Sequence, residues 1–189
     1  MKIEPGSLVP GTFCGLADVE SELFQKHLEG LTGVGVEIGC CDGYSTCVIL
    51  AASQLHLTSI DPLIADSMEK SLCGSEERLM KNTERFGERF QFLWQYSQDV
   101  VKDWTLPLDF VFIDGDHSYE AATADIESWG KLLMIDGIMA VHDSRMGRNG
   151  GAPFHEGTSQ AARELIYGRP DRWDIIGEAF SLTMARKHC

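Results

Sequence analysis

The stretch from Val34 to Thr46 (VGVEIGCCDGYST) constrains the fold more than any other part of the chain. Its first half alternates β-branched residues with small or acidic ones as far as Ile38, which is typical of a buried strand. Gly39 and Gly43 then let the backbone turn sharply, because glycine carries no Cβ. The apolar run at 47–50 predicts the buried side of a helix. A strand, a glycine turn and a helix in this order indicate an α/β sheet that binds a ligand at the carboxyl end of its first strand.

Strand and helix patterns alternate along most of the chain, which predicts a doubly wound, mostly parallel α/β sheet. Further strands are expected at 57–60, 90–96, 108–114, 137–142, 173–177 and 180–185, and helices at 16–31, 75–87, 119–133 and 158–167. Only Glu178 and Ala179 separate the last two strands, so these form a hairpin and run antiparallel. We expect one domain over 1–189, with an irregular arm and a covering helix in 1–33 and a Rossmann-like core in 34–189.

A formal net charge of -13 at pH 7 limits the partners that this surface can take. It repels phosphate backbones, so we expect no nucleic-acid partner, although Lys131, Arg145 and Arg148 could form a small basic patch. No run of about 18 apolar residues occurs, which argues against a membrane span, and residues 1–6 lack the apolar core of a signal peptide. The cysteines form no C-x-x-C pair and suit reduced thiols. We therefore expect a cytoplasmic protein.

The glycine turn also carries a motif. The nicotinamide fingerprint G-x-G-x-x-G fits it poorly, because Cys41 stands where a middle glycine is expected. Glu37, Gly39 and Gly43 instead make the pattern acidic-x-Gly-x-x-x-Gly, which resembles the first motif of class I S-adenosylmethionine-dependent methyltransferases. The resemblance implies that these three residues bind S-adenosylmethionine, in a sheet of seven strands whose last strand is antiparallel. The alternative is an ordinary strand-turn-helix in which Glu37 caps a local group.

Two further residues follow the ends of predicted strands, at positions where their side chains could bind a nucleoside. Asp61 ends the second strand, 22 residues after Gly39, where an acid can accept hydrogen bonds from both ribose hydroxyls. Nicotinamide enzymes share this feature, and the alternative is a local Asp-Pro turn. Ser97 follows the third strand, at a place where the resemblance implies contact with adenine. We therefore predict that Asp61 and Ser97 bind the cofactor.

A second group of polar residues follows the fourth and fifth strands, in the runs 114–120 (DGDHSYE) and 142–143 (HD). If these strands are adjacent, the carboxyl groups of Asp114 and Asp143 face one cleft, at the edge of the sheet where the glycine turn also lies. The two runs resemble a branch of small-molecule O-methyltransferases, which includes those of macrolide sugars and, more distantly, the catechol type. The resemblance covers about residues 34–186.

This resemblance assigns roles to the residues after the fourth and fifth strands. Asp114 and Asp143 would hold Mg2+, and Ser144 occupies the third ligand position, where Asp or Asn is commoner. His117 would be the catalytic base that takes a proton from the substrate hydroxyl. Asp114 is also expected to contact the cofactor. The alternative is that these side chains only cap turns and helix starts.

The expected function is transfer of a methyl group from S-adenosylmethionine to a hydroxyl of a small molecule, with the assistance of Mg2+ that the resemblance implies. A second hypothesis is a non-catalytic nucleoside-binding or scaffold protein that retains the fold. The missing glycine fingerprint argues against a third, a nicotinamide oxidoreductase. The substrate pocket must come from the arm at 1–15, the glycine-rich loop at 144–157 or a second subunit, and the last of these would require a homodimer.

Overall fold

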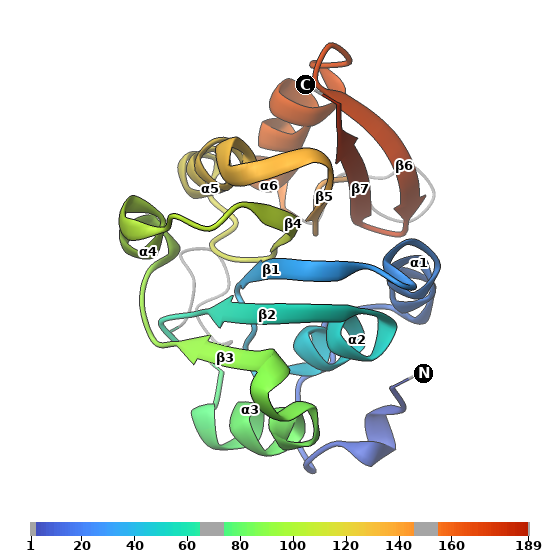
Figure 1. Ribbon diagram of the computed structural model, residues 1–189, viewed down its shortest axis with the longest axis vertical. Helices are drawn as coiled ribbons and strands as arrows, with labels where there is room; N and C mark the ends of the chain where they lie inside the picture. The colour runs from blue at the N-terminus through green and yellow to red at the C-terminus, as the bar shows by residue number, and fades with distance from the viewer. Residues whose placement is uncertain (1–2, 65–73, 146–154, 189) are drawn as a thin grey trace.

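A seven-stranded sheet forms the centre of the computed structural model, which describes residues 3–64, 74–145 and 155–188 (Figure 1). Its strands are β1 Thr32–Ile38, β2 Gln54–Ile60, β3 Phe90–Leu93, β4 Leu108–Ile113, β5 Leu133–Val141, β6 Trp173–Ala179 and β7 Leu182–Lys187. They lie in the order β3-β2-β1-β4-β5-β7-β6. The first five are parallel, whereas β7 runs antiparallel to both β5 and β6. The predicted fold class is therefore confirmed.

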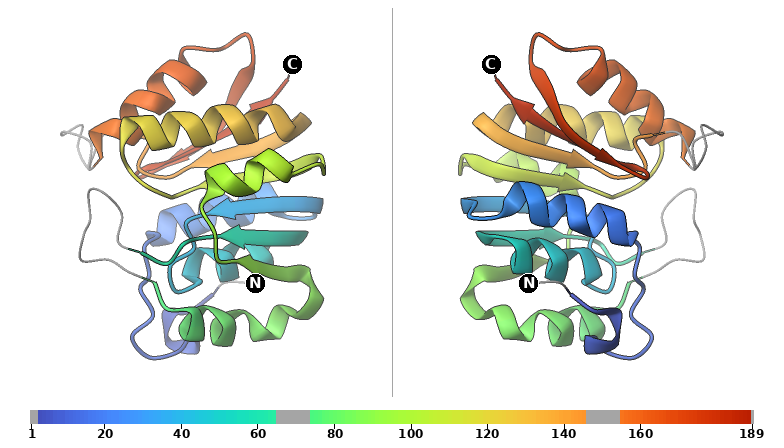
Figure 2. Two further views of the ribbon diagram at one scale, coloured as in Figure 1. Left: turned by 90° about the vertical axis from the view of Figure 1, so that its left-hand side faces the viewer. Right: turned by 90° about the vertical axis from the view of Figure 1, so that its right-hand side faces the viewer.

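Helices cover both faces of the sheet (Figure 2). They are α1 Asp18–Leu28, α2 Tyr44–Ala52, α3 Glu76–Thr83, α4 Ser97–Asp103, α5 Tyr119–Leu132 and α6 Glu156–Ala162, with 3-10 segments at Pro5–Ser7 and Glu84–Arg89 and a π-helical turn at Arg163–Tyr167. The helices α1, α2 and α3 lie on one face, and α4, α5 and α6 lie on the other. Ser118 caps α5, because its hydroxyl accepts a hydrogen bond from the N–H of Ala121 at 3.3 Å.

Each face of the sheet has its own apolar core. On one face Phe24 of α1 packs edge-on against Phe112 of β4, with ring centroids 5.2 Å apart. On the other face Trp129 of α5 is fully buried against the sheet. Burying a large apolar side chain contributes about 1.5–3 kcal/mol, so both layers hold the strands from which the polar loops emerge.

The order of the strands reverses between β1 and β4, and this switch point is where open α/β sheets bind ligands. Three residues just beyond the strand ends extend the hydrogen bonding of the sheet by one residue. The N–H groups of Gly39, Asp114 and His142 each donate to the last residues of a neighbouring strand, at 3.0, 2.8 and 3.0 Å. These bonds hold the loops after β1, β4 and β5 side by side.

The structure differs from the predicted elements at several places. The third strand ends at Leu93, and Ser97 begins the short helix α4, which the sequence pattern did not predict. The first helix is shorter than 16–31 because the carboxylate of Glu20 accepts the N–H of Ala17 at 2.7 Å and fixes its start. The fifth strand begins at Leu133 rather than at 137.

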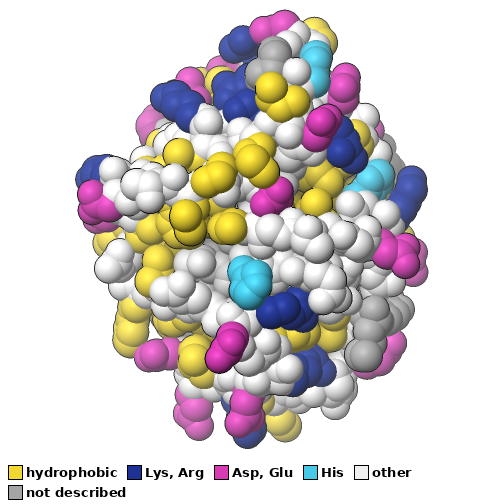
Figure 3. Space-filling view, in the orientation of Figure 1, with side chains coloured by type: hydrophobic (Ala, Val, Ile, Leu, Met, Phe, Trp, Pro, Cys, Tyr) yellow, Lys and Arg dark blue, Asp and Glu magenta, His cyan; other side chains and the backbone are white. Residues whose placement is uncertain are grey.

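The predicted partners stay a prediction, and only two properties of the described residues bear on them. On the face drawn in Figure 3, basic side chains are scattered among acidic ones rather than gathered in one patch. Within the described ranges, every helix is too short or too polar to cross a bilayer. Arg148, part of the small basic patch considered above, lies outside the described residues, as does 146–154 of the predicted substrate loop.

Candidate active site

The carboxyl ends of the central strands open into a cavity of about 600 Å3. Its wall combines the segments after β1, β2, β3, β4 and β5 with part of the N-terminal arm and the start of α6. Residues of the wall include Phe13, Leu16, Gly39, Cys40, Cys41, Asp61, Tyr96, Ser97, Asp114, His117, Asp125, His142, Asp143 and His155. The predicted cofactor turn and the predicted acid cluster therefore line one continuous hollow.

The two glycines of the turn serve different purposes. Gly39 has φ 80°, and a Cβ there would lie 2.0 Å from the backbone oxygen of Asp114. Only glycine therefore lets β1 and β4 end against each other at this point. Gly43 has φ 85°, and a Cβ there would meet Leu79 of α3 at 2.7 Å. Gly39 lines the cavity, whereas Gly43 packs behind it.

Glu37 lies beneath the turn and is fully buried. Its carboxylate accepts hydrogen bonds from the hydroxyls of Ser45, Thr46 and Ser59, at 2.5, 2.6 and 2.5 Å. Burial raises the pKa of Glu37 to about 7, although the three hydroxyl groups oppose the rise. Because its side chain is not part of the cavity wall, the structure places Glu37 as a brace under the turn and not at the predicted cofactor contact.

Asp61 lines the cavity and also clamps the turn. One carboxylate oxygen accepts the N–H groups of Cys40 and Cys41, each at 2.9 Å. The other oxygen accepts the N–H of Leu63 at 2.6 Å. This clamp fixes Cys41 at φ 47°, a left-handed conformation that favours glycine. Since a carboxylate offers about four acceptor positions, these three bonds leave capacity for one more.

Ser97 lies in the cavity wall at the start of α4, and its partner is a residue that sequence reasoning missed. The hydroxyl of Ser97 and the amide of Gln98 both donate to Asp125 of α5, the amide at 2.7 Å. Burial raises the pKa of Asp125, against the lowering effect of these two bonds. Asp125 lies on the same face of α5 as the buried Ile126 and Trp129. An acidic residue on an otherwise apolar helix face is the feature of the sequence that could have identified Asp125 as part of the site.

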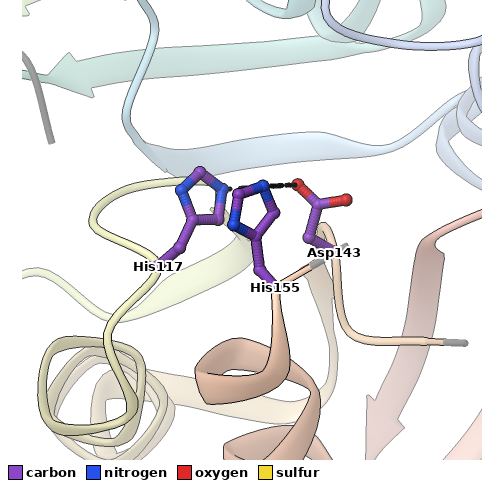
Figure 4. A group of neighbouring side chains, drawn as sticks. All are labelled: His117, Asp143 and His155. Carbon is purple, nitrogen blue, oxygen red and sulfur yellow. Dashed lines mark ion pairs between the residues drawn. The ribbon is translucent and has the colours of Figure 1, made fainter. Parts of the chain in front are cut away.

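The predicted acids meet in a cluster with histidines, of which Figure 4 shows Asp143 with His117 and His155. Asp114 and Asp143 lie 3.0 and 3.2 Å from Nδ1 of His142. The Nε2 atom of His117 lies 3.3 Å from Oδ2 of Asp143 and 3.9 Å from Oδ1 of Asp114. His155, at the N-terminus of α6, brings its Nε2 within 3.7 Å of the same Asp143 oxygen and stacks on His117. Three imidazole rings thus surround one carboxylate.

His142 connects this cluster to the covering helix α1. Its Nε2 lies 3.4 Å from Oε1 of Glu20, which is fully buried and also accepts the N–H and hydroxyl of Ser181 at 3.0 and 2.9 Å. Burial opposes a charge on His142, but Asp114, Asp143 and Glu20 outweigh it and hold the pKa of His142 well above its usual value.

The pKa of Asp143 is shifted in the opposite direction, below its usual value. Burial favours its neutral form, but His117 and His142 outweigh this effect and hold the pKa of Asp143 below its usual range. Asp143 therefore stays ionised at neutral pH. An ionised carboxylate beside His117 can stabilise a proton on that ring, which is what a general base requires.

The predicted metal ligand Ser144 does not reach this cluster. Its side chain is buried, and its hydroxyl lies 2.9 Å from the oxygen of Val141 and 2.8 Å from that of Thr183, between β5 and β7. Asp143, the residue before it, adopts φ 49°, and the role of Ser144 as a metal ligand stays a prediction. Mg2+ prefers oxygen ligands; Asp114 and Asp143 bring carboxylates together here, and bound Mg2+ stays a prediction.

Comparison with known proteins assigns the chain to a family. A family model described as a methyltransferase domain matches residues 36–144, which is more than half of the 189 residues. The chain belongs to this family. A curated but uncharacterized protein of Acanthamoeba polyphaga mimivirus is 34% identical over 118 residues. This match covers 57% of the methyltransferase and 50% of the viral protein, so the chain spans about half the length of that relative.

Solved structures share the fold of this methyltransferase at low sequence identity. An O-methyltransferase from Bacillus cereus, in complex with SAH, has a TM-score of 0.64 and 18% identity over 96% of this chain and 86% of that one. The O-methyltransferase TomG from Streptomyces achromogenes, in complex with SAM, has a TM-score of 0.61 and 16% identity over 93% and 82% of the two chains. At these identities the likeness establishes the fold alone.

Proposed function

We propose that this methyltransferase transfers a methyl group from S-adenosylmethionine to a hydroxyl of a small molecule, with His117 as the base. The observation that carries the proposal is the single cavity that joins the glycine turn and Asp61 to the cluster at Asp143. The Bacillus cereus and Streptomyces achromogenes neighbours, named as O-methyltransferases and solved with SAH or SAM, support it. The net charge of -13 favours a small acceptor over a nucleic acid.

The wall of the cavity offers the contacts that such a cofactor needs. When bound, S-adenosylmethionine supplies a methyl group already activated by its sulfonium. Gly39 lets the backbone approach the methionine part closely, since no Cβ stands in the way. Asp61, with capacity for one more hydrogen bond, lies where a ribose hydroxyl would donate. Ser97 and Asp125 form the polar end of the wall and would face the adenine.

His117 would take the proton of the acceptor hydroxyl. Its ring is held beside Asp143, with Nε2 3.3 Å from the carboxylate, so the imidazolium that forms is stabilised by an ionised neighbour. Positioning accounts for the rest, because the oxygen must approach the methyl group opposite the departing sulfur. His142 and Glu20 keep Asp143 in place from behind.

Ligand-dependent melting tests the proposal before any acceptor is known. A ligand that binds only the native state raises the melting temperature by mass action. We expect S-adenosylhomocysteine to raise it and NAD to leave it unchanged. A panel of small hydroxyl compounds is then screened for S-adenosylhomocysteine release, with His117→Asn expected to retain cofactor binding and lose turnover. A response to NAD alone would refute the proposal, and binding with no turnover on any acceptor would favour the non-catalytic alternative.

Size-exclusion chromatography with light scattering addresses the proposed homodimer. The arm residues Phe13 and Leu16 already supply part of the cavity wall. A second subunit is one source for the remainder of the acceptor pocket, and a mass twice that of the 21.0 kDa chain would support this.

A further inference from the structure

We infer that His155 is a positioning residue for the base: its imidazole lies flat against the ring of His117 and fixes the orientation in which that ring meets the acceptor. The inference rests on the proposed function, in which His117 takes the proton of the acceptor hydroxyl, and it adds the residue that holds the base in place. It is carried by the stacking of the two rings and by the packing of α6 against the turn at His117.

The two rings form a close and nearly parallel pair. Their centroids lie 3.8 Å apart, and their planes are inclined by 20°. Both side chains are largely buried, with 12% of His117 and 11% of His155 exposed. Figure 4 shows the ring of His155 lying over that of His117, with Nε2 of each ring directed at Asp143. One face of the base is therefore covered by a flat aromatic neighbour.

Asp143 alone does not fix the orientation of the base. Its Oδ2 atom lies 3.3 Å from Nε2 of His117 and so holds the outer end of the ring. The χ2 torsion of histidine is broad, and its axis runs from Cβ through Cγ and leaves the ring close to Nε2. A contact at Nε2 therefore restrains rotation about χ2 only weakly, whereas a flat neighbour against the face of the ring blocks it.

The χ2 angle of the base matters because an imidazole accepts a proton in the plane of its ring. Rotation about χ2 turns that plane and changes the line along which the acceptor oxygen must approach. A general base must come within about 2.6–3.2 Å of the atom that carries the proton, and a misplacement of about 1 Å can cost about a hundredfold in rate. By fixing χ2 of His117, His155 keeps the base aligned for the transfer.

The helix α6 brings His155 to this place because it packs against the turn that carries the base. His155 is the N-cap residue of α6. Two residues later, a Cβ on Gly157 would lie 2.5 Å from the backbone oxygen of His117 and 2.5 Å from the backbone nitrogen of Tyr119, so only glycine permits this approach. The hydroxyl of Tyr119 also donates to Glu164, just beyond α6, at 2.6 Å. The base and the ring stacked on it therefore belong to one packed unit.

The face of the His155 ring contributes more to this arrangement than its nitrogens. Its Nε2 lies 3.7 Å from Oδ2 of Asp143, whereas charge-assisted hydrogen bonds from nitrogen to a carboxylate are about 2.7–2.9 Å long. The stacked face, in contrast, lies at the usual contact distance between aromatic rings. A phenylalanine ring at this position would therefore keep the positioning effect, and alanine would remove it.

Three variants of the whole chain separate the ring from its nitrogens. His155→Phe keeps a flat ring and removes the nitrogens, His155→Ala removes both, and Gly157→Ala displaces α6 while both histidines stay. His56→Ala is the matched control, because His56 is exposed near the start of β2. Circular dichroism checks that each variant folds, and calorimetry with S-adenosylhomocysteine measures whether the cofactor site is unchanged.

The order of the base ring is measured without cofactor or acceptor. In protein that contains 13C-labelled histidine, the Cδ2–H signal of His117 is identified by its loss in His117→Asn, and its order parameter falls when the ring moves about χ2. We expect this order parameter to stay high in His155→Phe and His56→Ala and to fall in His155→Ala and Gly157→Ala.

Turnover provides the second measurement, with any acceptor that the panel identifies. His155→Ala and Gly157→Ala should lower kcat by about tenfold or more, with little change in KM or in the affinity for S-adenosylhomocysteine. His155→Phe should recover most of the kcat that His155→Ala loses. Gly157→Ala decides the matter if His155→Ala does not fold.

Two results would overturn the assignment. One is an order parameter of His117 that is the same in His155→Ala as in the wild type. The other is a His155→Phe variant that behaves like His155→Ala, since the nitrogens and not the face of the ring would then matter. Neither result bears on whether S-adenosylhomocysteine raises the melting temperature, so a failure of the positioning role and a failure of the proposed function are distinguishable.

Discussion

The buried carboxyl group of Glu37 makes the stability of the fold depend on pH in a way that one substitution should remove. The pKa of Glu37 is raised from an ordinary value near 4.5 to about 7 by burial beneath the glycine turn. Between these two values the folded chain therefore holds a proton that the unfolded chain has lost. The free energy of unfolding contributed by Glu37 is fully present below about pH 4.5 and falls as the pH rises through about 7.

The magnitude follows from the size of the rise. One pKa unit corresponds to about 1.4 kcal/mol, so the full effect is about 3 kcal/mol, of which about 2 kcal/mol falls between about pH 5.5 and about pH 8. Glu37→Gln keeps the shape and stays neutral throughout. Its hydroxyl partners Ser45, Thr46 and Ser59 can each turn to donate or accept, so any fixed cost of the amide is the same at every pH.

Urea unfolding of both proteins at matched pH measures the effect. Relative to the wild type, Glu37→Gln should gain about 2 kcal/mol as the pH rises from about 5.5 to about 8. The other titrating groups are common to both proteins and cancel in the difference. Glu22→Gln, at an exposed position of α1, is the matched control for a change from carboxylate to amide. A difference between Glu37→Gln and wild type that stays constant across this range would refute the reasoning.

Three further substitutions test the glycine turn at Gly39, the clamp formed by Asp61 and the link from His142 to α1 through Glu20. Gly39→Ala should cost about 3 kcal/mol or more, since its Cβ would lie 2.0 Å from backbone, whereas Gly30→Ala, also at positive φ but in open space, should cost about 1–2 kcal/mol in the same urea measurement. Asp61→Asn replaces one acceptor oxygen by an amide group that faces backbone N–H groups of the turn, so the free energy of unfolding should fall by about 1–3 kcal/mol. Calorimetry should also show weaker binding of S-adenosylhomocysteine, and unchanged binding would contradict a ribose contact at Asp61. Glu20→Gln should lower stability by about 1–3 kcal/mol, and a loss no larger than that of Glu22→Gln would contradict its burial.

The sequence predicts the sheet well because burial on both faces of a parallel strand requires continuous apolar runs. All seven strands lie where such runs were recognised, and the hairpin of β6 and β7 follows from the short gap between them. The helix α4 was missed because it has only seven residues and no buried side chain, so no apolar period marks it. The early start of β5 was missed because Met134 and Ile135 are exposed there.

Of the active site, the sequence predicts only the residues that lie at the ends of strands. Asp114, Asp143 and His117 come together because β4 and β5 are neighbours, and the spacing along the chain carries that information. The positions of Glu20 and His155 depend on how α1 and α6 pack onto the sheet, which no local pattern records.

The direction of the Ser144 side chain could not be predicted, for a related reason. A single left-handed residue, Asp143, reverses the direction of the next side chain, and the backbone conformation of one residue is not visible in the spacing of a motif. Glu37 shows the same limit, because a motif marks a position and not the face of the turn on which its side chain lies.

A crystal structure with S-adenosylhomocysteine tests the central claim most directly, namely that one cavity at the strand ends holds the cofactor against the cluster at Asp143. We expect the homocysteine part beside Gly39, the ribose at Asp61 and the adenine near Ser97, with the sulfur directed toward His117. A nucleoside bound elsewhere, or a sulfur that faces away from His117 and Asp143, would contradict the account.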